Sequence, residues 1–253
     1  MTYNDETPPS FLAIGVLSCV LFGVLGAVMA FSAYGEAIGK SNPTWVIGAG
    51  IAVFGIFVLP LVAQFLRNSH SVYRTGINGL AGAIGLSYAM TNSAISPFLT
   101  MPMNIGIRIF GLVFCIGGNI WWCGTFIRVY IKIYKDKSLF NKLYVDAGGF
   151  FVMVPGRDAR LIEKQLGFNQ MLPSYLLIPV LPLAPLSLVL ERIVEPVLGF
   201  GGFWTLAAFI FIPLSMMFNG LLVKGVLMYF YFPVKLTQMT GKPVNFARFW
   251  GGG

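Results

Sequence analysis

The side chains that could do chemistry are few in this sequence. It has one histidine, His70, and three cysteines, Cys19, Cys115 and Cys123, which all lie in apolar runs. A single histidine excludes bis-histidine haem ligation and histidine-rich zinc or di-iron sites by count. Because no CxxC pair is present, we expect the cysteines to be small core residues. The sequence therefore predicts no cofactor and no metal site.

Motifs for nucleophilic, metal-dependent or phosphate-binding catalysis are also missing. The sequence contains no GxSxG, HExxH, GxxxxGK[ST] or paired-glutamate motif. The glycine-rich run at 198–204, LGFGGFW, lacks the preceding strand and the Lys and Ser/Thr of a phosphate loop. His70 lies in a short polar connection beside Arg67 and Arg74, where a solvated side chain is the ordinary outcome. We therefore expect no catalytic residues and no enzymatic activity.

The overall composition predicts the environment of the chain. Of 253 residues, 57% are hydrophobic and 10% charged, against roughly 45–50% and 25% in a soluble domain. The mean hydropathy is +0.78, so the apolar side chains are too many for one water-soluble core. The net charge of +8 is explained by basic residues that flank apolar segments, which favours anionic lipid headgroups over nucleic acid as the partner.

The apolar runs predict an all-α polytopic membrane protein of about six transmembrane helices. Each run is long enough to cross a hydrocarbon core of about 30 Å at about 1.5 Å per residue. A cleaved signal peptide is disfavoured for the first run, because the leader is acidic and lacks Lys or Arg. The predicted spans are 11–33, 45–66, 76–99, 105–127, 171–190 and 197–219.

The third run leaves the number of spans open between five and six. Its glycines Gly76, Gly79, Gly82 and Gly85 recur at every third residue. Such small residues let a neighbouring helix approach closely, so we expect a helix-packing seam at Gly79, Gly82 and Gly85. A glycine-rich re-entrant segment is the alternative. Asn119 is a further candidate for helix packing, through hydrogen bonds between helices.

The distribution of charge predicts the orientation. In either version, all but three or four of the 17 basic residues lie on one side, which the positive-inside rule makes cytoplasmic. We expect a prokaryotic inner membrane protein with both termini in the cytoplasm. The predicted parts are membrane helices at 1–127 (about four spans), a cytoplasmic insertion at 128–170, membrane helices at 171–232 (about two spans), and a basic tail at 233–253.

The insertion at 128–170 predicts a small β-hairpin followed by a short helix. Strands are expected at 143–146 and 150–154, and Asp158 can cap a helix that ends near Leu166 before Gly167. Leu161, Ile162 and Leu166 would form the apolar face of that helix. So small a unit has no core of its own. It must therefore pack on the membrane, on its own helices or on a partner protein.

A basic helical face precedes the hairpin. Arg128, Lys132 and Lys135 are spaced i, i+4 and i+7, which puts three cations on one face beyond the apolar core. They could bind lipid phosphates or an acidic partner. Together with Phe150 and Phe151 of the hairpin, they form the predicted docking residues for lipid or protein.

The fifth run carries four prolines within 13 residues, Pro173, Pro179, Pro182 and Pro185. A regular helix cannot accommodate them without losing backbone hydrogen bonds, so a kinked or re-entrant segment is expected. Broken helices of this kind can bind substrates in transporters. Pro179, Pro182 and Pro185 are therefore the candidate substrate path.

Two functions follow from these patterns. The first is a non-catalytic membrane subunit of a larger secretion, translocation or transport assembly, which holds other membrane and cytoplasmic subunits as a scaffold and docking platform. The second is a small transporter or channel for an uncharged substrate that uses the proline-broken segment. No family resemblance is evident in the residues.

Overall fold

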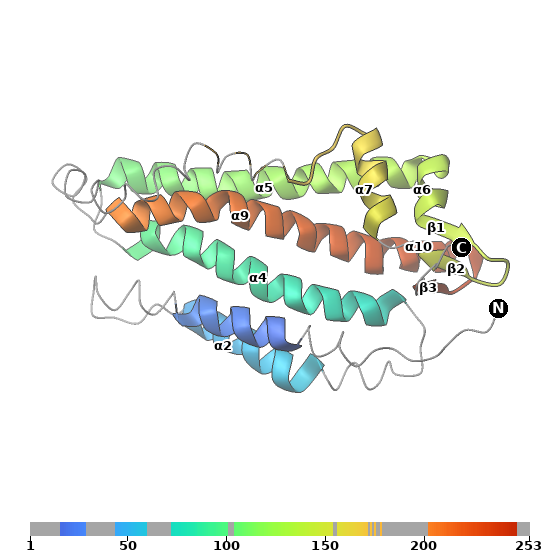
Figure 1. Cartoon of the computed structure of the whole chain (residues 1–253), viewed down its shortest axis with the longest axis horizontal. Coiled ribbons are helices and arrows are strands. Elements are labelled where there is room, and N and C mark those ends of the chain that lie inside the picture. Colours follow the sequence, from blue (N-terminus) through green and yellow to red (C-terminus); the bar gives the residue numbers. More distant parts are fainter. Residues whose placement is uncertain are drawn as a thin grey trace.

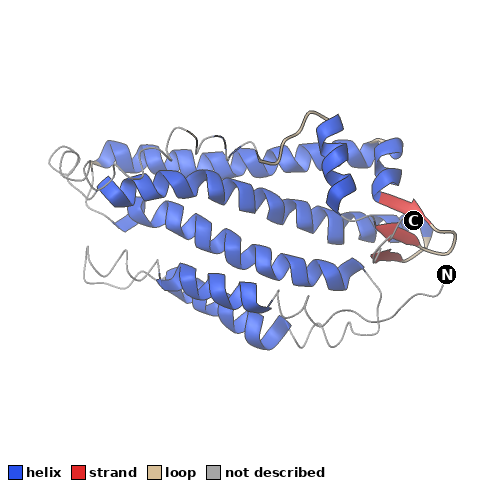
Figure 2. Ribbon diagram, viewed as in Figure 1, coloured by secondary structure: helices blue, strands red, loops and turns tan. Residues whose placement is uncertain are grey.

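The computed structural model describes residues 16–28, 44–59, 72–100, 104–153, 156–171, 173, 175, 178 and 202–246. Within them, 84% of residues are helical. Long helices lie side by side and a small sheet covers one end of them (Figures 1 and 2). We refer to this sheet, together with the two short helices α6 (Lys137–Leu143) and α7 (Gly156–Gln165), as the cap.

Two of the described helices are long and apolar enough to cross a membrane. One is α5 (Ile105–Lys135, 31 residues) and the other spans Ala208–Thr240 (33 residues). At about 1.5 Å per residue their lengths are about 46 and 50 Å, more than a hydrocarbon core of about 30 Å. Apolar side chains on the outer face of α5, such as Ile105 and Ile120, are each 69% exposed. The structure thus supports a membrane protein with two candidate spans.

The second of these helices is the C-terminal part of a longer, continuous one, which runs from Gly202 to Thr240. It begins with α9 (Gly202–Val226), passes through a π-helical segment η4 (Leu227–Tyr231), and continues as α10 (Phe232–Thr240). Pro213 lies within α9 without ending it. The apolar run at 197–219, for which the sequence also allows a helical continuation past Lys224 to Phe232, extends as a helix to Thr240.

The glycine-rich third run is helical throughout. It forms most of α4 (Val72–Thr100, 29 residues), so a loose segment is not what these residues adopt. Helix α4 lies against α9 on one side. On its other side are α2 (Thr44–Val53), which continues as the π-helix η1 (Phe54–Val58), and the helix Val16–Val28 (Figure 1).

Contacts along the helices fix their directions. The pairs Leu80 with Gly225 and Phe98 with Phe209 show that α4 and α9 are antiparallel. Gly118 lies near Met216 and Phe126 near Gly220, so α5 and α9 run in parallel. The main core follows the shared interface of these three helices and includes Ala94, Phe98, Cys115, Ala208, Ile212 and Met216, all buried.

The cap contains the predicted hairpin. Strands β1 (Tyr144–Asp146) and β2 (Phe151–Met153) pair antiparallel, with Tyr144 opposite Met153. Asp146 Oδ1 accepts a hydrogen bond from the Gly148 amide at 2.8 Å, and Gly148 has a φ of 91°, which favours glycine. The strands are shorter than expected, and Val154 lies outside the described residues.

A third strand was not predicted from the sequence. Residues of the C-terminal tail form β3 (Val244–Phe246), which pairs in parallel with β2, with Phe151 opposite Val244. A parallel pair joins segments that are far apart in the chain, so no tight-turn motif in the sequence predicts this pairing. Part of the predicted tail at 233–253 is therefore built into the cap.

The hairpin is attached to the long C-terminal helix by a buried hydrogen bond. In the π-helical segment the Phe232 amide donates to the Leu227 carbonyl, five residues back. The next donor would be residue 233, but it is proline and has no N–H. The Tyr144 hydroxyl instead donates to the Met228 carbonyl at 2.6 Å. Burial raises the pKa of Tyr144, which keeps the hydroxyl protonated as a donor.

Stacked and edge-on aromatic rings join the cap to the helix ends. Phe232 lies 6.4 Å from Tyr130, 5.3 Å from Tyr134 and 5.8 Å from Phe140, measured between ring centroids. Tyr144 continues the series at 5.0 Å from Phe140. The hairpin thus packs on its own helices, which is one of the alternatives left open by the sequence.

Helix α7 ends as the sequence predicts. The Gly167 amide donates to the Lys164 carbonyl and the Phe168 amide to the Glu163 carbonyl, both at 2.9 Å, and Gly167 has a φ of 68°. These two bonds form a Schellman motif. Phe168 then packs on Phe126 with ring centroids 4.9 Å apart. The C-terminal end of α7 is therefore held on the helix bundle.

Candidate functional site

The basic face on α5 is solvent-exposed. Arg128, Lys132 and Lys135 are all exposed, and within the described part of the chain no carboxylate lies within ion-pair distance of them. The nearby Asp136 is engaged as the N-cap of α6, where Oδ1 accepts from the Ser138 and Leu139 amides at 2.9 and 3.3 Å. The three cations are therefore available to an external anion.

The two phenylalanines of the hairpin have different surroundings. Phe150 is half-buried, whereas Phe151 is 9% exposed and belongs to the main core. The ammonium group of Lys242 lies 5.5 Å from the centroid of the Phe151 ring. The Phe151 ring is therefore used in the sheet's own packing, and Phe150 is the more exposed of the two predicted docking residues.

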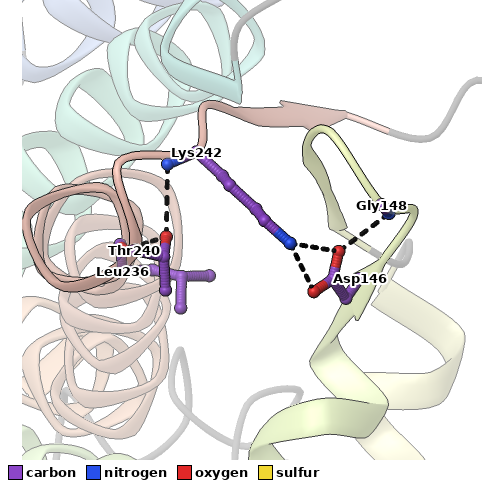
Figure 3. Close-up of polar contacts among 5 residues, drawn as sticks. All are labelled: Asp146, Gly148, Leu236, Thr240 and Lys242. Atoms are coloured by element: carbon purple, nitrogen blue, oxygen red, sulfur yellow. Dashed lines mark hydrogen bonds and ion pairs between the residues drawn. The ribbon is translucent and has the colours of Figure 1, made fainter.

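An exposed ion pair ties the C-terminal segment to the hairpin (Figure 3). Lys242 Nζ lies 2.8 Å from Asp146 Oδ2 and 3.1 Å from Oδ1, while the Lys242 amide donates to Thr240 Oγ1 at 3.3 Å. The bond from Lys242, helped by the Gly148 amide, holds the pKa of Asp146 below its usual range. The pair positions Lys242 at the point where β3 begins.

A buried polar cluster lies where α7 meets α5 and α9. Glu163 of α7 is 2% exposed, and its Oε1 accepts hydrogen bonds from the Tyr130 hydroxyl at 2.5 Å and from Lys224 Nζ at 2.7 Å. The Lys224 side chain is 14% exposed and also reaches Gln170 Oε1 at 3.4 Å. We call these four residues the Glu163 cluster.

The Glu163 cluster is not predicted by the sequence pattern, and the inner face of α7 differs from the predicted one. Leu161, expected on the apolar face, is 53% exposed, and Glu163 is buried in its place. Lys224 was the available signal, because it is a single cation inside an otherwise apolar helix. Intramembrane charges are costly and require a partner. The carboxylate that pairs with Lys224 is decided by where α7 packs on the helices, and the sequence alone does not give that position.

A second polar network lies deeper between the helices and contains the predicted residue Asn119. Asn119 Nδ2 donates to Ser215 Oγ at 2.9 Å and to the Cys115 carbonyl at 2.8 Å. Asn219 Nδ2 donates to Asn119 Oδ1 at 2.7 Å and to Thr91 Oγ1 at 2.9 Å. Asn119 therefore links α5 to α9, and Asn219 extends the link to α4. We call Thr91, Asn119, Ser215 and Asn219 the Asn119 network.

The predicted glycine seam is only partly used. A Cβ atom at Gly85 would lie 3.3 Å from Cys19 Cα, and one at Gly82 would lie 3.2 Å from the Ser18 Cβ. Both glycines thus face the helix Val16–Val28. Gly79 is exposed, and a Cβ atom there would meet no other described atom within 4 Å. Gly79 therefore does not share the contact of Gly82 and Gly85 with this helix, because period-three glycines do not all lie on one face of a 3.6-residue helix. Close packing at Gly79 stays a prediction.

Other predicted groups lie apart from these clusters or outside the described residues. Pro179, Pro182 and Pro185 fall outside the described residues, as does His70. Among the described residues, no group of three or more His, Cys, Asp or Glu side chains could hold a metal ion. The sequence was also compared with known proteins: no protein-family profile, curated protein or solved structure matches the chain.

We predict that a large side chain at Gly85 separates two helices, whereas the same change at Gly79 does not. Gly85→Leu should lower the free energy of unfolding by about 1–3 kcal/mol through overpacking against Cys19. Gly79→Leu is the matched control, since it lies on the same helix and has open space. Thermal unfolding of both variants in detergent measures the difference, and equal midpoints would contradict the seam.

We also predict that Glu163 stabilises the docked position of α7. Glu163→Ala should destabilise the fold by about 3 kcal/mol, because it leaves Lys224 and Tyr130 without their acceptor. The exposed neighbour Lys164 supplies the control, and Lys164→Ala should change stability by less than about 0.5 kcal/mol. A double change, Glu163→Leu with Lys224→Leu, should recover much of the loss. A double variant no more stable than Glu163→Ala would argue against a mutual pair.

Proposed function

We propose that this chain is a non-catalytic integral membrane subunit of a larger assembly, in which it acts as a scaffold and docking platform. The observation that carries the proposal is the cap. It is fixed to the helix ends by Tyr144 and the Glu163 cluster, while the cations of α5 beside it have no carboxylate partner among the described residues. A fixed surface with free charges suits the binding of an acidic partner.

The docking surface we propose consists of Arg128, Lys132 and Lys135 on α5, together with the half-buried Phe150 of the hairpin. Phe151 is left out because its ring is buried. The same cations also suit the phosphates of anionic lipids, which we expect as a second partner where the helix leaves the bilayer. Partner subunits would include membrane proteins that pack on apolar helix faces and cytoplasmic proteins that bind beside the cap. A secretion, translocation or multisubunit transport complex would fit this role.

The topology we propose has six spans, with both termini in the cytoplasm of a prokaryotic cell and the chain in its inner membrane. The length of α4 supports its inclusion as a span, because 29 residues extend about 43 Å. Its Gly, Ala, Ser and Asn residues lower its hydropathy but suit helix packing. The distribution of Lys and Arg supports the orientation.

The topology can be checked at the two ends of α4. We expect cysteines introduced at Ser71 and at Thr100 to react with a membrane-impermeant maleimide from opposite sides of the membrane. The measurement uses intact cells and inverted vesicles, with the half-buried Cys123 replaced by serine as background. Labelling of both positions from the same side would refute six spans.

The docking proposal predicts a charge-dependent complex. In mild detergent the wild-type chain should co-purify with stoichiometric partner subunits, and Lys132→Glu with Lys135→Glu should lose the cytoplasmic partner by at least tenfold. Reversal of charge replaces attraction by repulsion, which costs several kcal/mol at an interface. Quantitative mass spectrometry of the purified complex is the measurement.

Lys235→Glu is the matched control, since Lys235 is exposed on α10 at the same end of the molecule. It should leave the complex intact. If the double reversal removes only anionic phospholipid and retains every subunit, the face binds lipid and the protein-docking surface is elsewhere. Wild-type chain that purifies without stoichiometric partners would count against the scaffold function itself.

The Asn119 network favours a second candidate function. Polar side chains within a membrane helix bundle are costly and often mark a path for substrate. A small transporter or channel for an uncharged substrate would combine this network with Pro179, Pro182 and Pro185. Solute flux by the isolated chain in liposomes would support this candidate over the scaffold.

A further inference from the structure

The side chains of the Asn119 network bond one another, but two buried polar atoms within about one helical turn of the network along the chain have no partner in the part of the chain that the structure describes. Ser87 is 4% exposed and Trp122 is 1% exposed, and neither Ser87 Oγ nor Trp122 Nε1 has a hydrogen-bond partner among the described residues. A buried hydroxyl or indole N–H without a partner is disfavoured, and lipid supplies no replacement. Two such atoms beside one polar network need an explanation.

Ser87 lies on the face of α4 that meets α9. Leu80 contacts Gly225, Thr91 bonds Asn219, and Phe98 packs on Phe209, so these α4 positions define the face. Position 87 follows Leu80 by seven residues and precedes Thr91 by four, spacings that keep a residue on one helical stripe. The Ser87 hydroxyl is therefore about one turn from Thr91 on the interface with α9.

Trp122 occupies the corresponding place on α5. It follows Asn119 by three residues, and a Cβ atom at Gly220 would lie 2.8 Å from Trp122 Nε1. The edge of the indole that carries the N–H thus faces α9 at Gly220, the residue that follows Asn219 in the chain. The N-terminal end of α4 and the C-terminal end of α5 both lie at the cap (Figure 1). Ser87 precedes Thr91 and Trp122 follows Asn119 in the chain, so both are on the cap side of the Asn119 network.

The chemistry of this position favours a neutral ligand. The nearest cation on α9, Lys224, is already bonded to Glu163, and the network itself consists of amide and hydroxyl groups. The indole N–H can only donate, whereas the serine hydroxyl can donate and accept. A molecule that accepts from Trp122 and bonds Ser87 must therefore be small, uncharged and able to act as both acceptor and donor, as water is.

We propose that the bundle binds a small uncharged hydrogen-bonding molecule between Ser87 and Trp122, at the cap side of the Asn119 network. The site goes beyond the scaffold function, which does not require it, so its failure would leave the docking proposal unaffected. Water and a small polyol or amide solute share the chemistry that the site recognises. The experiments below separate these two sources.

The first experiment uses the sign of a stability change. With a bound ligand, Ser87→Ala removes a hydrogen bond and should lower the unfolding midpoint of the full chain in detergent by about 2–4 °C. Ser215→Ala is the positive control, because Ser215 Oγ donates to the Ile212 carbonyl and accepts from Asn119. If Ser87→Ala leaves the midpoint unchanged or raises it, the hydroxyl has no partner and the proposal is overturned.

The second experiment observes the indole N–H of Trp122. The ultraviolet resonance Raman difference spectrum, wild type minus Trp122→Phe, should show a hydrogen-bonded indole. Ser87→Ala should shift the signal of the Trp122 indole. If Trp122→Phe does not fold, the difference spectrum of wild type minus Ser87→Ala measures the same indole signal. A persistent hydrogen-bonded signal after exhaustive washing in solute-free buffer identifies water. A signal that is lost on washing and restored by glycerol or urea identifies a solute. A free indole under all these conditions overturns the proposal.

Discussion

Pairing of polar side chains between α5 and α9 is the constraint on which this structure depends. Lipid offers these helices neither a hydrophobic drive to associate nor hydrogen-bond partners for buried groups. Deep in the bundle, Asn119 donates a hydrogen bond to Ser215 and accepts one from Asn219, which holds the helices together and gives these buried groups partners. Nearer the cap, Glu163 does so by bridging Tyr130 and Lys224. The two helices are thus held in one register at two levels, and α4 joins through Thr91.

That register in turn positions the cap. Pro233 deprives the long C-terminal helix of one donor, and Tyr144 of the hairpin supplies it at the Met228 carbonyl. Phe232, in the same turn, carries the aromatic contacts of α5 and α6. The hairpin therefore has a fixed orientation although its three-residue strands are too small to be stable alone. A cap that is fixed in this way can present the cations of α5 at a defined place.

The distribution of charge separates two kinds of chemistry. Exposed cations at the cap end are free to attract acidic surfaces or lipid phosphates, whereas Lys224 is neutralised within the fold by Glu163. In the Asn119 network the polar groups are neutral amides and hydroxyls. The exposed cations therefore lie at the cap end, and the polar pairing between α4, α5 and α9 deeper in the bundle uses uncharged groups.

The sequence by itself determined the membrane character, the helical fold, the hairpin, the stop at Gly167 and the exposed basic face, because composition, helical periodicity and turn residues are local properties. It also singled out Asn119 as a bridge. Only the tertiary structure decided that Glu163 is buried while Leu161 is exposed, that Gly85 is in a seam while Gly79 is open, and that the tail adds a strand beside Phe151. Each of these depends on which distant segment packs against the residue, and spacing along the chain does not carry that information.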